Sequence, residues 1–142
     1  MRARVWITLS ERDWKDLYPF HCAAQLGDAS SLEAQLAAGG VSLDAVDDDG
    51  WAALHYSAWY GHSDAVRVLL AAGADVNVRN GAQATPLHFA AGAGRVAVVR
   101  ALLQAGADRT LRSHEKQTPA ELTKQLQPDG YERILSMLQD GL

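Results

Sequence analysis

The chain has 142 residues, of which 48% are hydrophobic and 21% are charged, and its formal net charge at pH 7 is -4. This length and composition are typical of one soluble globular domain, and no apolar run approaches the roughly 18 residues that would span a bilayer. A net negative charge argues against nucleic acid as a partner, because phosphate binding requires an excess of Lys and Arg on the binding surface.

Cys22 is the only cysteine in the sequence. A single cysteine excludes an internal disulfide and a cysteine-rich metal cluster, and it is compatible with a reducing compartment. The apolar run near the N-terminus stops at Ser10, which makes it too short for a secretion signal. We therefore expect a cytoplasmic or nuclear protein.

Residues 1–15 have no counterpart in the rest of the chain, and we treat them as an N-terminal extension. The stretch from Ser10 to Asp13 has the pattern of a helix start, with an acidic residue three positions after a serine. Val5-Trp6-Ile7 could form a short strand or pack back on the residues that follow.

One pattern recurs with a period of 33 to 34 residues: an apolar residue, a histidine directly after it, and a glycine closing the same helix. The copies are Phe20-His21 with Gly27, Leu54-His55 with Gly61, and Leu87-His88 with Gly94. A period in this range predicts a solenoid, in which each unit buries its apolar face only against its neighbours.

Each unit is predicted to contain two short helices. In the clearest copy, Thr85 suits the N-cap and Pro86 suits the first helical position of a helix that closes at Gly94. The second helix carries apolar residues at the i, i+3, i+4 spacing and ends at a glycine. These stripes are Val66, Leu69 and Leu70, then Val99, Leu102 and Leu103, followed by Gly73 and Gly106.

These residues resemble the ankyrin repeat, whose signature includes T-P-L-H-x-A-A-x-x-G and a later L-L-x-x-G-A-D. The resemblance covers about residues 16 to 140 as four repeats. It implies an all-α ankyrin-repeat solenoid of stacked helix-turn-helix units with β-hairpin-like loops. The implied domain spans residues 16–142, with repeats at approximately 16–46, 47–79, 80–112 and 113–142.

The second and fourth units depart from the family pattern. The second has Ala52 where threonine is usual, so the threonine–histidine hydrogen bond of the motif cannot form there. The fourth has Glu121 in place of the histidine, and Pro128-Asp129-Gly130 is expected to interrupt its second helix. Its polar residues are typical of a terminal cap.

The repeated histidines could suggest a metal site. Packed helices lie about 8 to 10 Å apart, whereas zinc needs each ligating nitrogen within about 2.1 Å, so His21, His55 and His88 cannot share one ion. We expect them to hydrogen-bond to backbone groups of the adjoining turns. The sequence predicts no metal and no cofactor.

Two further residues have a chemical and a structural interpretation. Cys22 follows His21 on a predicted helix, and a small buried thiol is favoured over a nucleophile. The resemblance also places Asn77 at the spacing favoured by the asparagine hydroxylase that modifies ankyrin repeats, although an asparagine serving only the turn is the favoured interpretation. No catalytic motif is present, so we expect no enzyme.

In the family that the chain resembles, partners usually bind in the concave face, at the hairpin tips and on the exposed side of the first helices. Carried over to this sequence, the tips are Asp48, Asp49, Trp51, Gly81, Ala82, Ala84, His114, Glu115 and Gln117. The corresponding helix positions are Gln25, Leu26, Trp59, Tyr60, Gly92 and Ala93.

The second repeat thus presents Trp51, Trp59 and Tyr60 to the groove beside two aspartates. Such a surface suits a protein or peptide partner that carries basic residues and an apolar anchor. Alternatively, the rings stack on one another, or the segment with Trp6 and Trp14 folds over them. Tyr56 and Phe89 are expected in the core.

The resemblance therefore predicts a non-catalytic protein-protein interaction module, acting as an adaptor, an inhibitor or an assembly chaperone, and monomeric when free. Two alternatives stay open. The chain could be a structural or oligomerising element whose aromatic residues form a self-contact surface, or a regulatory subunit of a larger enzyme complex.

Overall fold

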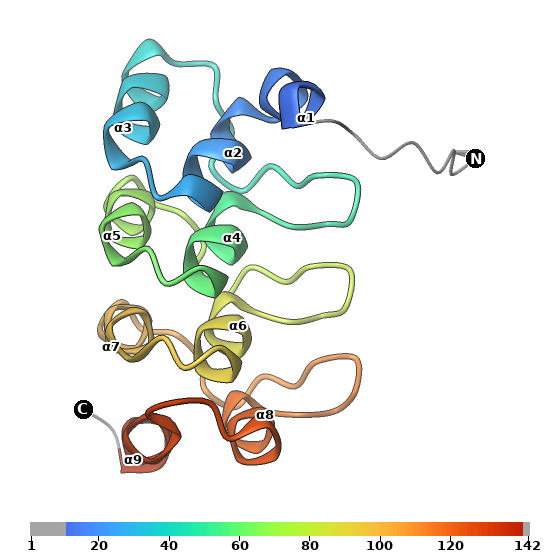
Figure 1. The fold of residues 1–142 in the computed structure, drawn as a ribbon, viewed down its shortest axis with the longest axis vertical. Coiled ribbons are helices and arrows are strands. Elements are labelled where there is room, and N and C mark those ends of the chain that lie inside the picture. The colour runs from blue at the N-terminus through green and yellow to red at the C-terminus, as the bar shows by residue number, and fades with distance from the viewer. Residues whose placement is uncertain (1–10, 141–142) are drawn as a thin grey trace.

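The computed structural model describes residues 11–140 and shows a solenoid of stacked helix pairs (Figure 1). The described residues form nine helices and no β-strand, with one isolated antiparallel bridge between Val46 and Ala52. The predicted all-α solenoid is confirmed. The helices are α1 Glu11–Leu17, α2 Pro19–Leu26, α3 Ala29–Ala38, α4 Ala53–Trp59, α5 Ser63–Ala71, α6 Pro86–Gly92, α7 Val96–Gln104, α8 Pro119–Leu126 and α9 Tyr131–Asp140.

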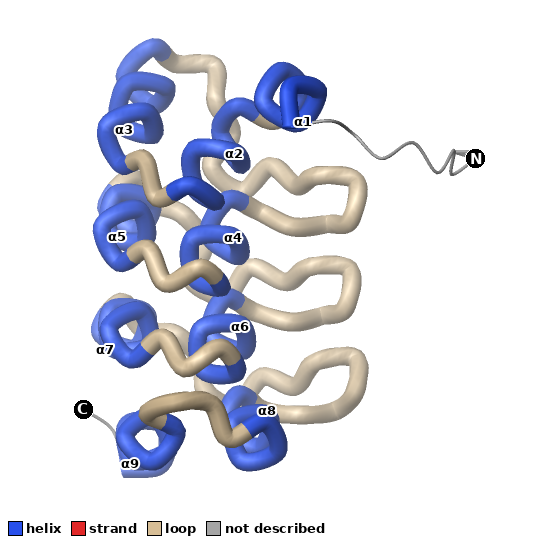
Figure 2. The backbone as a smooth tube through the Cα atoms, in the orientation of Figure 1, coloured by secondary structure: helices blue, strands red, loops and turns tan. Residues whose placement is uncertain are grey.

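The helices form two columns. The inner column contains α2, α4, α6 and α8, and the outer column contains α3, α5, α7 and α9 (Figures 1 and 2). Long loops precede α4, α6 and α8 and project from the inner column on the side away from the outer helices (Figure 2). The inner helices and these loops line the two recesses described below, and we call their shared surface the groove.

The first described helix, α1, spans Glu11–Leu17 and packs on α2. It crosses the boundary that we placed after residue 15. Val5-Trp6-Ile7 and Ser10 lie outside the described residues. None of the described helices has the length and apolar character needed to cross a bilayer.

Apolar side chains between the two columns form a continuous core. The predicted stripes supply it: Val66 and Leu69 on α5, and Val99 and Leu102 on α7, are fully buried. Small residues fill the contacts between inner helices and allow close approach. These alanines, each buried, are Ala24, Ala58, Ala90 and Ala91. Cys22 is also buried, as predicted.

The inner helices start at the predicted caps. In the third repeat, the Thr85 hydroxyl lies 2.8 Å from His88 Nδ1, and the Thr85 backbone N–H donates to the same nitrogen at 3.1 Å. In the second repeat, Ala52 offers no hydroxyl, but its backbone N–H still donates to His55 Nδ1 at 3.0 Å. The histidine therefore caps its helix even where the threonine is missing.

The same histidines join each inner helix to the next loop. Because Nδ1 accepts a hydrogen bond in His55 and His88, the proton is on Nε2, which donates to the carbonyls of Ala84 and Gln117 at 3.0 and 2.8 Å. Burial lowers the pKa of His55 to about 4 and also lowers the pKa of His88. The structural interpretation of these histidines is confirmed.

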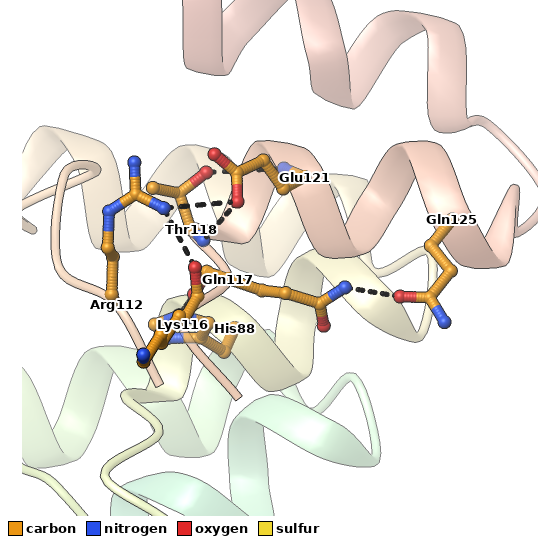
Figure 3. Close-up of polar contacts among 7 residues, drawn as sticks. All are labelled: His88, Arg112, Lys116, Gln117, Thr118, Glu121 and Gln125. Carbon is orange, nitrogen blue, oxygen red and sulfur yellow. Dashed lines mark hydrogen bonds and ion pairs between the residues drawn. The ribbon is translucent and has the colours of Figure 1, made fainter. Parts of the chain in front are cut away.

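The fourth repeat ends the stack with polar contacts (Figure 3). The Thr118 hydroxyl accepts a hydrogen bond from Glu121 N–H at 3.3 Å, so Glu121 takes the capping position of the histidine. Arg112 donates to the Lys116 carbonyl at 2.7 Å and lies 3.4 Å from the Glu121 carboxylate, as Figure 3 shows.

One prediction about this repeat is wrong. Pro128-Asp129-Gly130 does not interrupt the second helix, because it lies in the turn between α8 and α9. Gln127 ends α8 in the left-handed conformation, at φ 45°, and the three following residues lengthen the turn before α9 starts. The position of proline after a left-handed cap explains this arrangement.

Backbone-to-side-chain bonds also connect successive turns on the outer side. Asp75 N–H donates to Asp44 Oδ1 at 3.0 Å, and Asp108 N–H donates to Asn77 Oδ1 at 2.8 Å. Asn77 thus serves the contact between two repeats, in agreement with the interpretation of this residue as part of the turn.

Candidate functional site

Three aromatic rings, those of Trp51, Trp59 and Phe89, each pack against the other two and begin a line of rings that extends toward α1. We name these three the aromatic row. Trp51 lies in the loop before α4, Trp59 ends α4, and Phe89 lies on α6. The ring centroids of Trp59 and Phe89 are 5.2 Å apart with planes 12° from parallel, and Trp51 lies 5.1 and 4.4 Å from these two rings. These distances are typical of favourable offset stacking.

The aromatic row continues toward α1. The Tyr56 ring lies 5.1 Å from Trp51, and the Trp14 ring lies 5.5 Å from Tyr56. Trp14 Nε1 donates to Gln25 Oε1 at 3.0 Å, which fixes the indole at this end. Trp51 and Trp59 therefore stack on each other, as one alternative expected, whereas Tyr60 stacks on His62. Trp14 lies at the end of this line of rings. Trp6 lies outside the described residues.

Stacking leaves part of the row accessible. Trp59 is 43% exposed and Tyr60 is 45% exposed, whereas Trp51 is half-buried. The expectation that Phe89 lies in the core is wrong: its ring is only partly buried and borders two recesses. The third repeat has only Gly92 and Ala93 at the neighbouring surface positions, so Phe89 is covered by Trp51 and Trp59 but by no bulky side chain at Gly92 or Ala93 of its own repeat.

The first recess, which we name the tip trough, lies along the hairpin tips and has a volume of about 870 Å³. It is lined by Asp48 and Asp49 at one tip and by His114 at another. All three are exposed. The remaining lining residues are Gly50, Trp51, Asn80, Gly81, Ala82 and Phe89.

Buried polar side chains hold the hairpin tips in shape. Asp47 is buried, and its Oδ1 accepts hydrogen bonds from the N–H groups of Asp49 and Trp51 at 3.0 and 2.9 Å. Its other oxygen accepts a hydrogen bond from the Tyr56 hydroxyl. Burial, together with this bond to a carboxylate, raises the pKa of Tyr56. The tip of the second repeat is thus tied to the aromatic row.

The second recess, which we name the apolar slot, lies on the inner helices and has a volume of about 250 Å³. Gly92 on α6 is central to its shape, because a Cβ added there would lie 3.2 Å from Leu122 Cδ2 and 3.3 Å from Leu126 Cδ1. The lining residues come from α4, α6 and α8: Trp59, His88, Phe89, Gly92, Ala93, Leu122 and Leu126.

The structure brings most of the sequence-predicted binding residues to these two recesses. In the tip trough are Asp48, Asp49, Trp51, Gly81, Ala82 and His114, and in the apolar slot are Trp59, Gly92 and Ala93. Gln25, Leu26 and Tyr60 lie outside both recesses, and Gln25 Nε2 lies 3.4 Å from the Tyr60 hydroxyl. Glu115 is exposed but lines neither recess.

The structure contradicts the prediction for Ala84. It was expected at a hairpin tip, but it is only 6% exposed, and its carbonyl accepts the hydrogen bond from His55. The loop has already returned to the inner column at this residue, because Asn80 N–H donates to the Ala84 carbonyl at 3.0 Å and closes the loop below its tip.

Sequence reasoning missed Leu122 and Leu126. A signal was present, since Leu126 follows Ala93 by one repeat length of 33 residues and so occupies the same groove position. The fourth repeat was interpreted only as a polar cap. Among residues 11–140, no group of three His, Cys, Asp or Glu side chains is placed to hold a metal ion.

Comparison with known proteins identifies the repeats. A family model described as ankyrin repeats (3 copies) matches residues 5–80, and one described as ankyrin repeats (many copies) matches residues 60–103. The ankyrin repeat-containing protein P1E11.10 of Schizosaccharomyces pombe is 38% identical over 47 residues, which is 33% of this chain and 23% of that protein.

Two other relatives have different overall roles. The NAD-capped RNA hydrolase NUDT12 of Homo sapiens is 36% identical over 66 residues, which is 46% of this chain and 14% of the hydrolase. The calmodulin-binding transcription activator 6 of Arabidopsis thaliana is 41% identical over 66 residues, which is 46% of this chain and 8% of the activator. The chain spans less than a quarter of the length of these three relatives.

Proposed function

Because the chain belongs to the ankyrin-repeat family, whose domains are generally non-catalytic protein-protein interaction modules, we propose that its groove binds a partner protein. The bound surface comprises the aromatic row and the two recesses beside it. In this role the chain acts as an adaptor, an inhibitor or an assembly chaperone in the cytoplasm or nucleus.

The observation that carries this proposal is the partial exposure of Trp59 in the groove. Its ring stacks on Phe89, yet 43% of the residue remains exposed to solvent. Tryptophan is among the residue types that dominate interface energies, especially where it lies in a recess from which a partner can exclude water. A ring held in place by stacking also loses little conformational entropy on binding.

The electrostatics of the groove favour a basic partner. Asp48 and Asp49 are exposed at the tip trough, next to Trp51. Acidic tips beside aromatic rings suit a segment with lysine or arginine and an apolar anchor. The charges would act mainly on the association rate and the orientation of the partner, since charges at an exposed rim contribute little to affinity.

The substitution Trp59→Ala tests the proposal. Removal of this ring should abolish capture of the partner from a native lysate, as read by mass spectrometry. It should lower the melting temperature by only a few degrees, because the ring lies at the surface of the stack. Leu17→Ala is the matched control: Leu17 is 61% exposed on α1, outside the groove, and should leave capture unchanged.

Light scattering over a concentration series separates the adaptor from an oligomerising element. The adaptor is a monomer at all concentrations in both the wild type and Trp59→Ala. A mass that rises with concentration in the wild type and not in Trp59→Ala would mean that the exposed ring contacts a second copy, and would contradict the proposal. Capture that does not depend on Trp59 would also contradict it.

A further inference from the structure

The apolar slot arises from one missing side chain in the inner column. The helical position that Trp59 occupies in α4 is taken by Gly92 in α6, which lies one repeat length further along the chain. The next equivalent position in α8 is Gln125, whose side chain bonds to Gln117 in the preceding loop (Figure 3). The aromatic row therefore stops at Gly92.

The missing side chain leaves apolar surfaces facing each other across the slot. Trp59 and Phe89 form one wall, and Leu122 and Leu126 form the other. Leu126 is 54% exposed, although it could have been covered by a bulky residue at Gly92. Apolar surface that remains accessible in a recess gains free energy when a partner side chain displaces its water.

The polar groups near the slot are already occupied. His88 Nε2 donates to the Gln117 carbonyl, and Nδ1 accepts from the Thr85 N–H, so this side chain offers no free hydrogen-bonding group to a ligand. Among the described residues, none that lines the slot is lysine, arginine, aspartate or glutamate. The slot thus suits an apolar group and disfavours a charged one.

The tip trough lies directly beside the slot and carries acidic side chains where the slot carries apolar ones. Phe89 lines both recesses, so the two are contiguous across a single ring. The trough carries the carboxylates of Asp48 and Asp49, which attract a cation. A ligand that covers both recesses must present an apolar group and a cationic group next to each other.

We infer that the apolar slot takes one bulky apolar side chain of a partner protein segment, and that an arginine or lysine of the same segment lies in the tip trough. This inference rests on the proposed function and names the chemistry of the partner. Leucine, methionine or an aromatic residue provides the anchor, and the cation provides the orientation.

The decisive variant is Gly92→Leu, which fills the slot from within. Gly92 lies in a helix, and the nearest atoms to an added Cβ are the ends of leucine side chains that can move. Replacing a helical glycine also favours the helix, so the variant should fold. Leu126→Ser removes the exposed part of the leucine wall and leaves Leu122 in place. Ala97→Leu, on the exposed side of α7, is the matched control for added bulk.

The probe is an immobilised series of short synthetic peptides, each with one apolar residue and one arginine or lysine at varied spacing in an alanine-serine background. Wild type and Ala97→Leu should retain a subset of these peptides. Gly92→Leu and Leu126→Ser should weaken binding of that subset at least tenfold, and Gly92→Leu should do so without lowering the melting temperature. Peptides with glutamate in place of the basic residue, or alanine in place of the apolar one, should not bind.

Several outcomes would overturn the inference. These are a failure of every peptide to bind, binding that Gly92→Leu leaves intact, and a preference for acidic peptides. Binding that appears only after deletion of residues 1–10 would assign the slot to the chain itself, and a dimer that Gly92→Leu dissociates would assign it to a second copy. If Trp59→Ala abolishes capture from lysate but Gly92→Leu does not, the proposal of an interaction module is supported and the assignment of the apolar slot is wrong.

Discussion

At the scale of single residues, the hairpin tips show how one backbone geometry is met by different side chains. Gly50 has φ 79°, and the equivalent residues one and two repeats later are Gln83 and Lys116, with φ 58° and 63°. A left-handed conformation is costly for a residue with a Cβ. The repeat keeps the same left-handed turn at all three positions, and Gln83 and Lys116 adopt this conformation at an energetic cost that Gly50 does not have.

The substitution Gln83→Gly should therefore raise the free energy of unfolding. Relief of the left-handed conformation gains about 1 to 2 kcal/mol, and the greater freedom of glycine in the unfolded chain removes about 0.5 to 1 kcal/mol of that gain. We expect a net stabilisation of up to about 1.5 kcal/mol, measured by urea unfolding followed by circular dichroism.

The reverse change provides the control for this prediction. Gly50→Gln should destabilise, because φ is positive and an added Cβ would lie only 2.8 Å from the backbone nitrogen of Gly81 in the next loop. A loss of stability in Gln83→Gly would show that the tip gains more from the glutamine side chain than it loses in backbone strain.

At the scale of the elements, the histidines make each inner helix dependent on the loop that follows it. His55 is fully buried, accepts a hydrogen bond at Nδ1 and donates one at Nε2 to the Ala84 carbonyl. A protonated ring could not accept at Nδ1 and would place a charge in the core. The helix–loop contact therefore requires the neutral form.

This requirement predicts a dependence of stability on pH. The pKa of His55 is about 4 in the folded chain and about 6.5 in the unfolded chain, so between these values the unfolded state binds the extra proton. The contribution is complete above pH 6.5 and is lost as the pH falls toward 4. The loss amounts to about 3 kcal/mol, measured by urea unfolding at several pH values.

The variant His55→Gln isolates the residue behind this effect. It should be less stable than the wild type at pH 7.5, because the buried contacts change, but its stability should fall less steeply between pH 6.5 and 4.5. An unaltered slope would mean that other groups cause the acid sensitivity. His88, whose pKa burial also lowers, would then be the next residue to replace.

The elements also show what the sequence could and could not predict. The caps at Thr85 and Thr118, the glycine helix ends and the buried leucine stripes depend on residues close together in the chain, and all were predictable. The position of Phe89 was not, because its exposure depends on Gly92 and on Leu122 of the next repeat. Ala84 was misplaced because loop closure by Asn80 has no strong local signature.

At the scale of the whole molecule, stability is distributed along one axis. The inner helices stack in chain order, so α6 packs between α4 and α8, and in the outer column α7 packs between α5 and α9. By contrast, α3 lies at the end of its column and packs mainly against α2 and α5 (Figure 1). The repeats share one core, but each central repeat lies between two others, whereas the first pair adjoins one repeat and has the short helix α1 packed on α2 alone.

Hydrogen exchange read by mass spectrometry should reveal this gradient, with the slowest exchange in α4, α6 and α7 and faster exchange in α2 and α3.

A matched pair of substitutions sharpens the test, since Leu32 on α3 and Leu87 on α6 are both fully buried leucines. Each change to alanine removes a similar volume and costs about 2 to 5 kcal/mol. Leu32→Ala should accelerate exchange mainly in α2 and α3, because the first repeat can open without separating the others. Leu87→Ala should accelerate exchange throughout the chain, because opening the third repeat removes support from both neighbours. Equal effects of the two substitutions on all helices would mean that the stack unfolds as one cooperative unit, with no weaker end.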